Sequence, residues 1–277
     1  MASWQLRAAA LQLRSTDDLA ANLATCRELG ERATSEGADL LVLPECFPFL
    51  GRSERDKLGI AEDFDRGGPM LETLRELAIR GSAWVVGGGM PEVVAGDANR
   101  TYNTAVVIDP RGELVTRYRK IHLFDIDIPH GVSMRESDAT CAGDTPVVVE
   151  INGAKVGLSI CYDLRFPELY RRLVKDLGAE VLLVPAAFTA LTGAAHWHLL
   201  LRARAIEDQA YVVAAAQWGK HNEKRESYGH SLIVDPWGTV IGERSDGDGI
   251  VVASLDGNVV ERRRMQMPCL EHAVLWK

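Results

Sequence analysis

The sequence predicts an α/β protein, a four-layer α-β-β-α sandwich made of two pseudo-symmetric halves. Two observations lead to this fold class: segments of the first half recur in the second half, and the recurring segments include strands that are apolar throughout. Such strands need cover on both faces, which helices outside and a second sheet inside provide. The chain has 277 residues, 47% of them hydrophobic, and we expect a single domain over residues 1–277.

Three pairs of similar segments occur in the same order in both halves. The pairs are GADLLVLPECF (37–47) with GAEVLLVPAAF (178–188), AWVVGGG (83–89) with AYVVAAA (210–216), and YNTAVVIDPRGELV (102–115) with YGHSLIVDPWGTVI (228–241). The DPxG sequence in the last pair is typical of a type I turn between two strands. Each half is therefore expected to alternate strands and helices and to close with a hairpin.

The first half is expected to begin with a strand over residues 4–13. Thr16, Asp17 and Asp18 then supply the cap and the acidic first turn of a helix. Gly37 ends this helix and opens the first repeated segment. These signals place a strand, a helix and a second strand within the first 43 residues of the chain.

Glu45 directly follows the apolar strand of the first repeat, and its counterpart in the second half is Ala186. A carboxylate at the end of a buried strand is costly unless it has a partner or a function. The fold repeats without this carboxylate, which makes Glu45 a candidate functional residue. A surface carboxylate just past the strand is the alternative.

Lys120 ends a strand expected over residues 114–120 and shares the less charged of its two faces. A solvated lysine at a strand end is the alternative for this residue. Residues 125–144, rich in charge, proline and glycine, are expected to form a long loop of the kind that covers sites. Glu136 lies in this loop, where no periodicity predicts its direction.

Cys161 lies between an apolar strand, residues 156–160, and a helix expected to begin at Pro167. The partial positive charge at the start of a helix predicts a lowered pKa for this thiol and a nucleophilic thiolate. A small buried hydrophobe is the alternative for a lone cysteine. Because ligands bind at the carboxyl ends of strands in α/β sheets, we expect Glu45, Lys120 and Cys161 to meet at the seam between the halves.

These side-chain types support acyl transfer from an amide or nitrile to water. A glutamate can take the thiol proton, deliver it to a leaving amine and then activate water against the thioester. A lysine ammonium, together with the backbone N–H of Tyr162, would stabilise the oxyanion, each donor contributing roughly 3 kcal/mol.

A histidine base is the alternative, which would make the protein a Cys-His hydrolase. His196 and His198 lie two positions apart on a helix expected over residues 195–210, with Leu199 and Ile206 on its apolar stripe. Side chains two apart on a helix point in different directions, so neither a metal pair nor a shared site is expected. The other candidates lie beside Lys120 or in loops: His122, His130 and His230.

Three motifs are similar to those of the nitrilase (carbon-nitrogen hydrolase) superfamily: LPE (43–45), YRKIHLFD (118–125) and GLSICYDLRFPE (157–168). The resemblance spans essentially the whole chain, with the motifs in the family's order. It implies a nitrilase-like α-β-β-α sandwich and a catalytic triad of Glu45, Lys120 and Cys161. A second glutamate, matched by Glu136, would position the lysine and the substrate. The resemblance also implies dimers that extend the sandwich, and no metal or organic cofactor.

Within the superfamily, the chain resembles the Nit branch of amidases through KIHLFDIDIP, FTALTGAAHWHLLLRARAIEDQ and the DPWG hairpin. This resemblance implies that Arg165 binds a substrate carboxylate and that Phe188 and Thr192 line the pocket. An arginine can clamp a carboxylate through two parallel hydrogen bonds. A structural ion pair of Arg165 with Asp163 or Glu168 is the alternative.

The segment QWGKHNEKRESYGHS (217–231) is more similar to the subgroup that acts on deaminated glutathione than to the ω-amidases that act on 2-oxoglutaramate. Its basic residues Lys220, Lys224 and Arg225 are expected to form a solvated loop, although they could meet a substrate carboxylate. Other small aliphatic or N-carbamoyl amides remain alternative substrates. The alternative from another class is a binding homologue without catalysis.

The composition favours a cytoplasmic protein without a nucleic-acid or membrane partner, and the resemblance implies a small-molecule amide substrate. A net charge of -8 gives no general attraction to nucleic acid or to an anionic membrane. The five cysteines are widely spaced and lack CxxC pairs, which fits a reducing compartment. The N-terminus resembles no secretion signal, and no apolar run reaches the roughly 18 residues of a membrane helix.

The tail from about residue 256 has no counterpart in either half. It contains a basic run followed by apolar residues, VVERRRMQMP and CLEHAVLWK. Such a segment is expected to pack either on its own domain or at a subunit interface.

Overall fold

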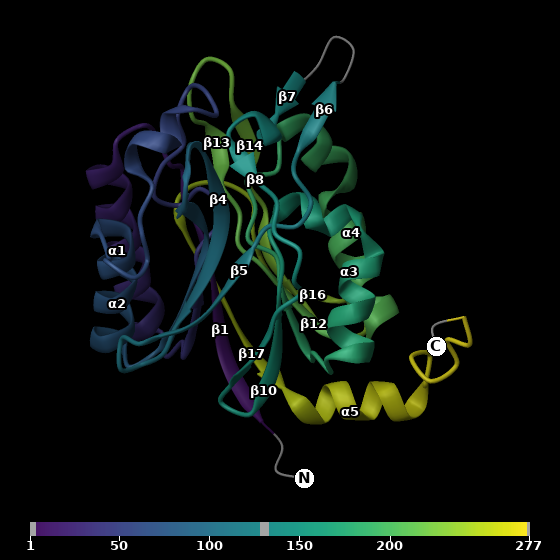
Figure 1. Cartoon of the computed structure of the whole chain (residues 1–277). Helices are drawn as coiled ribbons and strands as arrows, with labels where there is room; N and C mark the ends of the chain where they lie inside the picture. Colours follow the sequence, from purple (N-terminus) through teal and green to yellow (C-terminus); the bar gives the residue numbers. More distant parts are fainter. Residues whose placement is uncertain (1–3, 128–132, 276–277) are drawn as a thin grey trace.

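Two β-sheets lie face to face at the centre of the molecule, and helices cover the outer face of each (Figure 1). The structure is a computed structural model that describes residues 4–127 and 133–275. One sheet is covered by α1 (Leu19–Ser35) and α2 (Pro69–Gly81), and the other by α3 (Pro167–Arg171) and α4 (Ala190–Asp208). The predicted α-β-β-α sandwich is confirmed.

The first sheet has the order β17-β1-β2-β3-β4-β5, and β8 pairs with β4. Its strands are β1 (Gln5–Gln12), β2 (Leu40–Val42), β3 (Trp84–Val94), β4 (Asp97–Ile108), β5 (Leu114–Arg119), β8 (Thr140–Cys141) and β17 (Gly249–Asp256). The second sheet has the order β16-β15-β12-β11-β10-β9. Its strands are β9 (Val148–Ile151), β10 (Ala154–Leu158), β11 (Val181–Leu183), β12 (Tyr211–Ala214), β15 (Ser231–Val234) and β16 (Val240–Arg244).

The two sheets share one topology. β1, β2 and β3 pair in parallel, as do β10, β11 and β12, and each set continues into an antiparallel hairpin. An antiparallel strand flanks each set on its other side, β17 beside β1 and β9 beside β10. In the two DPxG turns, Gly112 donates to the carbonyl of Asp109 and Gly238 to that of Asp235. The pseudo-symmetry predicted from the repeated segments is therefore present in the strand order.

The predicted cap of α1 and the predicted glycine after it are confirmed, but no acidic residue lies in the first turn of this helix. The Asp18 side chain caps α1 by accepting a hydrogen bond of 3.0 Å from the amide of Ala21. Gly37, with φ of 82°, turns the chain toward β2. The helix that begins at Pro167 changes after α3 into a π-helical turn, Arg172–Asp176, so its regular part is shorter than expected.

The predicted apolar stripe of α4 is wrong. Leu199 is 69% exposed and Ile206 is 50% exposed, whereas Trp197 and Leu201 are fully buried. Trp197 packs on Phe188 with ring centroids 5.0 Å apart. Burying an indole removes more apolar surface from water than burying a leucine does. The face of α4 that carries Trp197 therefore packs against the sheet, and the face that carries Leu199 faces solvent.

The C-terminal helix α5 (Gly257–Gln266) projects from the edge of the sandwich (Figure 1). Gly257 and Val260 are its buried residues, and the Arg264 guanidinium donates to the carbonyl of Ala179 at 2.8 Å. Met265 on its outer side is 75% exposed. In the part of the chain that the structure describes, no helix combines the length and the hydropathy that crossing a membrane requires.

Candidate active site

The structure brings together Glu45, Lys120 and Cys161, which follow three different strands. Glu45 lies three residues after β2, Lys120 directly follows β5, and Cys161 lies three residues after β10. The Lys120 Nζ is 2.9 Å from Glu45 Oε1, and the Cys161 thiol is close enough to the Glu45 carboxylate for the carboxylate to raise its pKa. Two of these strands belong to the first sheet and one to the second, so the group lies at the seam between the halves.

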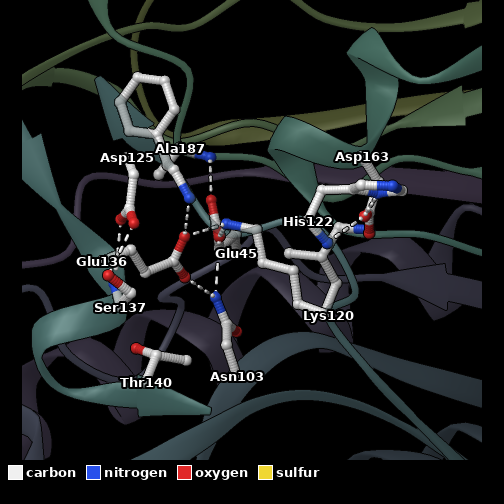
Figure 2. A network of polar contacts seen from close by, with 12 residues as sticks. Glu45, Asn103, Lys120, His122, Asp125, Glu136, Ser137, Thr140, Asp163 and Ala187 are labelled. Atoms are coloured by element: carbon white, nitrogen blue, oxygen red, sulfur yellow. Dashed lines mark hydrogen bonds and ion pairs between the residues drawn. The ribbon is translucent and has the colours of Figure 1, made fainter. Parts of the chain in front are cut away.

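Glu136 completes a buried charge network around Lys120 (Figure 2). Its Oε2 lies 2.8 Å from Lys120 Nζ and also accepts a hydrogen bond of 2.7 Å from the amide of Phe124. The side chains of Lys120, Glu45 and Glu136 are 2%, 6% and 7% exposed, so one ammonium faces two carboxylates almost out of contact with water.

Asn103 links the two carboxylates, and the sequence reasoning missed it. Its Nδ2 donates to Glu45 Oε1 at 2.9 Å and to Glu136 Oε1 at 3.2 Å (Figure 2). Its counterpart in the second repeat is Gly229. The comparison of halves that singled out Glu45 would therefore also have singled out this polar residue.

Two close backbone approaches fix the position of Glu45. Its Oε2 accepts a hydrogen bond of 3.0 Å from the amide of Ala187, beyond the strand of the second repeat. A Cβ on Gly88 would lie 1.9 Å from the carbonyl oxygen of Leu43 and 2.3 Å from Pro185 Cβ. Glycine is thus required at Gly88, because the chain before Glu45 passes directly against it.

The charges of the network follow from burial and mutual attraction. Burial alone would lower the pKa of Lys120, but the carboxylates of Glu136 and Glu45 raise it well above its usual value. Burial likewise would raise the pKa of Glu136, but the ammonium groups of Lys120 and Lys57 and the hydrogen bond from Phe124 hold it below its usual value. Lys120 is thus a fixed cation rather than a base, and Glu136 is its fixed counterion.

The predicted lowering of the Cys161 pKa is wrong. Burial and the neighbouring Glu45 carboxylate raise the pKa of this thiol well above its usual value, against the lowering effect of Lys120. Cys161 begins a short 3-10 turn, Cys161–Arg165, and α3 starts only at Pro167, beyond the reach of its N-terminal partial charge. The resting thiol therefore keeps its proton and lies beside the Glu45 carboxylate, an arrangement that suits base-assisted attack.

Asp163 anchors the turn that carries Cys161. It is fully buried and accepts hydrogen bonds from the Tyr118 hydroxyl at 2.7 Å and the Ile160 amide at 2.9 Å. His122 contacts the same carboxylate through its amide at 3.0 Å and through Nδ1 at 2.7 Å (Figure 2). The ring of His122 is thereby engaged with Asp163 rather than with the thiol, which argues against a Cys-His pair at this position.

A cavity of about 300 Å³ opens over these groups. It is lined by all eight residues that the sequence singled out: Glu45, Lys120, Glu136, Cys161, Tyr162, Arg165, Phe188 and Thr192. The Arg165 guanidinium lies 5.1 Å from the centroid of the Phe188 ring, and its Nη1 is 3.4 Å from His196 Nδ1. The Asp163 carboxylate accepts its hydrogen bonds from other donors, so the alternative ion pair of Asp163 with Arg165 is not formed. The Arg165 guanidinium lines the cavity instead.

A second basic group lines the same cavity. Arg225 forms an ion pair with Glu54, which also contacts Lys57 at 2.8 Å, and the neighbouring Lys224 is exposed at the cavity lining. Lys224 and Arg225 lie in the connection between β13 (Trp218–Lys220) and β14 (Glu226–Tyr228), which pair as a hairpin. Lys220 is exposed and does not line the cavity, as expected for a solvated loop, whereas Lys224 and Arg225 line the cavity.

The segment 125–144 contains more structure than the expected loop. β6 (Asp125–Asp127) and β7 (Ser133–Arg135) form a small antiparallel sheet. The Asp125 carboxylate accepts hydrogen bonds from the amide and hydroxyl of Ser137, which places Glu136 toward Lys120. Residues 128–132, which include His130, lie outside the described part of the chain.

Comparison with known proteins places this arrangement in a family. The chain is 45% identical over 269 residues to a protein of Synechocystis sp. named deaminated glutathione amidase, covering 96% of this chain and 97% of that protein. The C. elegans NitFhit protein matches with a TM-score of 0.92 and 40% identity, covering 100% of this chain and 67% of that chain. A structure of a Nesterenkonia amidase in which acrylamide has added to the active-site cysteine matches with a TM-score of 0.77 and 26% identity, covering 95% of this chain and 98% of that chain. The carbon-nitrogen hydrolase family model matches residues 7–265, and the chain therefore belongs to the carbon-nitrogen hydrolase family.

Proposed function

We propose that the protein is an amidase that hydrolyses deaminated glutathione through a thioester on Cys161. The observation that carries this proposal is the cavity that Cys161, Glu45 and Lys120 line together, in which all three side chains are buried and Lys120 Nζ lies 2.9 Å from the Glu45 carboxylate. A nucleophile, a base and a fixed cation in one cavity supply what acyl transfer requires. The cysteine adduct in the related Nesterenkonia amidase supports the choice of nucleophile.

In the first half-reaction, the sulfur of Cys161 attacks the amide carbonyl carbon while its proton passes to Glu45. The negative charge that develops on the carbonyl oxygen is stabilised by the Lys120 ammonium and the backbone N–H of Tyr162. The carbon–nitrogen bond then breaks, and Glu45 delivers the proton to the leaving nitrogen. The amine departs neutral, and the acyl group remains on sulfur as a thioester.

In the second half-reaction, Glu45 takes a proton from a water molecule whose oxygen attacks the thioester carbonyl. The same two donors stabilise the second oxyanion. The carbon–sulfur bond breaks, and the proton held by Glu45 returns to the sulfur of Cys161. Glu136 acts as a positioning residue that holds Lys120, and the scheme requires no cofactor.

The choice of substrate rests on the relatives and on the charges around the cavity. The Synechocystis protein is named deaminated glutathione amidase. This compound carries a carboxylate on each side of the amide that is cleaved. Arg165, near Phe188 and Thr192, would bind the 2-oxo-acid carboxylate, and Lys224 and Arg225 would meet the glycine carboxylate.

The substrate assignment is tested by kcat/KM for deaminated glutathione and for 2-oxoglutaramate, a shorter amide without the glycine carboxylate. We expect deaminated glutathione to be preferred, because only this substrate can use both basic groups. A preference for 2-oxoglutaramate, for an N-carbamoyl compound or for another aliphatic amide would contradict the substrate. Failure to hydrolyse any of them would favour a binding homologue.

We further propose that residues 1–277 form one domain that works in the cytoplasm as a homodimer. The tail from about residue 256 would pack at the subunit interface, where the exposed side chain of Met265 on α5 would be covered. Sedimentation equilibrium of the whole chain tests this assembly. A monomer at micromolar concentration would contradict it.

A further inference from the structure

Two histidines and a glutamate converge on the outer surface of the second half. His198 belongs to α4, His230 lies in the turn before β15, and Glu243 belongs to β16. The Nε2 atom of His198 and the Nδ1 atom of His230 lie 2.8 Å and 2.6 Å from the same Glu243 oxygen, Oε1. All three donor atoms lie within 4.8 Å of one another. None of the three residues lines the cavity above Cys161.

We propose that His198, His230 and Glu243 bind a divalent transition-metal ion of the zinc class. Two imidazoles and one carboxylate form a donor set that suits zinc, with a fourth position left for water or another ligand. Two nitrogen donors disfavour magnesium and calcium, which prefer oxygen ligands. The ion would lie between the three donor atoms, in place of the protons that now join the two rings to the carboxylate.

The surroundings of His230 hold its ring in place before any ion binds. His230 has φ of 57°, a conformation that a histidine keeps only where its neighbours fix it. Its carbonyl accepts a hydrogen bond of 2.8 Å from Trp197 Nε1, and its amide donates to the carbonyl of Ser245 at 3.2 Å. The ring of Tyr228 stacks on the imidazole with centroids 4.3 Å apart. A preformed donor lowers the entropy that the ion must overcome.

Solvent can reach the site. The side chains of His198, His230 and Glu243 are 35%, 23% and 33% exposed, so an ion can enter and keep a water ligand. Each donor comes from a different element, and β16 is the edge strand of its sheet. A bound ion would therefore tie this edge to α4 and add its binding free energy to the stability of the folded state.

The test is zinc binding by the whole chain, measured by titration calorimetry with zinc chloride and by the visible spectrum of added cobalt(II). We expect one ion per chain and a cobalt spectrum without a thiolate charge-transfer band, since the ligands are nitrogen and oxygen. Glu243→Gln and His230→Asn should each weaken zinc binding by at least about tenfold, a loss that even indirect partners of metal ligands can cause. Asparagine tolerates the positive φ at His230, which keeps that variant folded.

His196→Ala is the matched control, because His196 lies on the same helix but outside the cluster. It should bind zinc as the wild type does, and zinc should raise the melting temperature of both. Equal zinc affinity in wild type, Glu243→Gln and His230→Asn would overturn the proposal, as would the absence of binding by the wild type. Melting curves without metal show whether each variant is folded, so a loss of binding is not mistaken for unfolding.

Discussion

Replacing Lys120 by methionine tests the charge network directly. The Lys120 ammonium lies 2.9 Å from Glu45 and 2.8 Å from Glu136, in a site where all three side chains are nearly inaccessible. Methionine keeps most of the side-chain volume and removes the charge. The variant leaves two buried carboxylates without a cation, and breaking such a buried pair costs about 3–5 kcal/mol.

The expected destabilisation of Lys120→Met depends on pH. Without Lys120, burial of Glu136 is no longer offset by that ammonium, so the pKa of Glu136 in the folded state rises above that in the unfolded chain. The folded variant then holds protons that the unfolded chain has released, so its stability falls as pH rises. Urea unfolding should show a larger deficit against wild type at pH 8 than at pH 5.

Activity should fall more than stability alone explains. Loss of one oxyanion donor costs about 3 kcal/mol of transition-state stabilisation, or about 10²-fold in kcat, and Glu45 also loses the ammonium that holds its carboxylate in place. We expect kcat/KM for deaminated glutathione to fall by at least about 10³-fold. Lys155→Met, at an exposed position on β10, is the matched control and should change neither quantity.

The double variant Lys120→Met with Glu136→Gln separates the two effects. It leaves a single buried carboxylate, so part of the lost stability should return, whereas the oxyanion donor is still missing and activity should not. Two results would refute the reasoning: Lys120→Met as stable as Lys155→Met at pH 8, or a double variant that regains wild-type kcat/KM.

Three further predictions concern residues around the site and beneath the tail. Asn103→Ala removes the donor shared by the two buried carboxylates and should lower kcat by about tenfold or more while KM changes little; an unchanged kcat would contradict this role. Lys224→Ala should raise KM for deaminated glutathione a few-fold but leave KM for 2-oxoglutaramate unchanged, and an equal effect on both would exclude contact with the glycine carboxylate. Burial raises the pKa of Asp208 from 3.8 to about 7, so the folded protein holds a proton that the unfolded chain releases, and stability falls as pH rises between these values. Asp208→Asn should therefore unfold at a higher temperature than wild type at pH 8, by up to about 4 kcal/mol in stability, with a much smaller difference at pH 4; a gain that does not depend on pH would contradict the assignment.

The repeated segments predicted two similar halves that each close with a hairpin, because hydrophobic pattern and turn chemistry are local properties of the sequence. The same comparison identified Glu45, whose counterpart Ala186 carries no charge. The buried face of α4 was not predictable from apolar spacing alone, because the contact of Trp197 with Phe188 decides which side turns inward.

The pKa of Cys161 shows what sequence cannot supply. A helix start after the cysteine suggested a lowered pKa, yet the carboxylate that raises this pKa belongs to Glu45, far away along the chain. Burial and that carboxylate outweigh a helix N-terminus that lies several residues farther on. Asn103 could have been found by comparing the two halves, because its counterpart is Gly229, but only the folded chain shows that it joins Glu45 to Glu136.

The central claim, that Cys161 carries the acyl group, is tested most directly by kcat/KM of Cys161→Ala for deaminated glutathione, measured on protein shown by its melting curve to be folded. The substitution removes only the sulfur, and its site beneath the cavity leaves little to repack. The account predicts that hydrolysis falls to the rate without enzyme. Hydrolysis at a rate within tenfold of wild type would contradict a thioester mechanism.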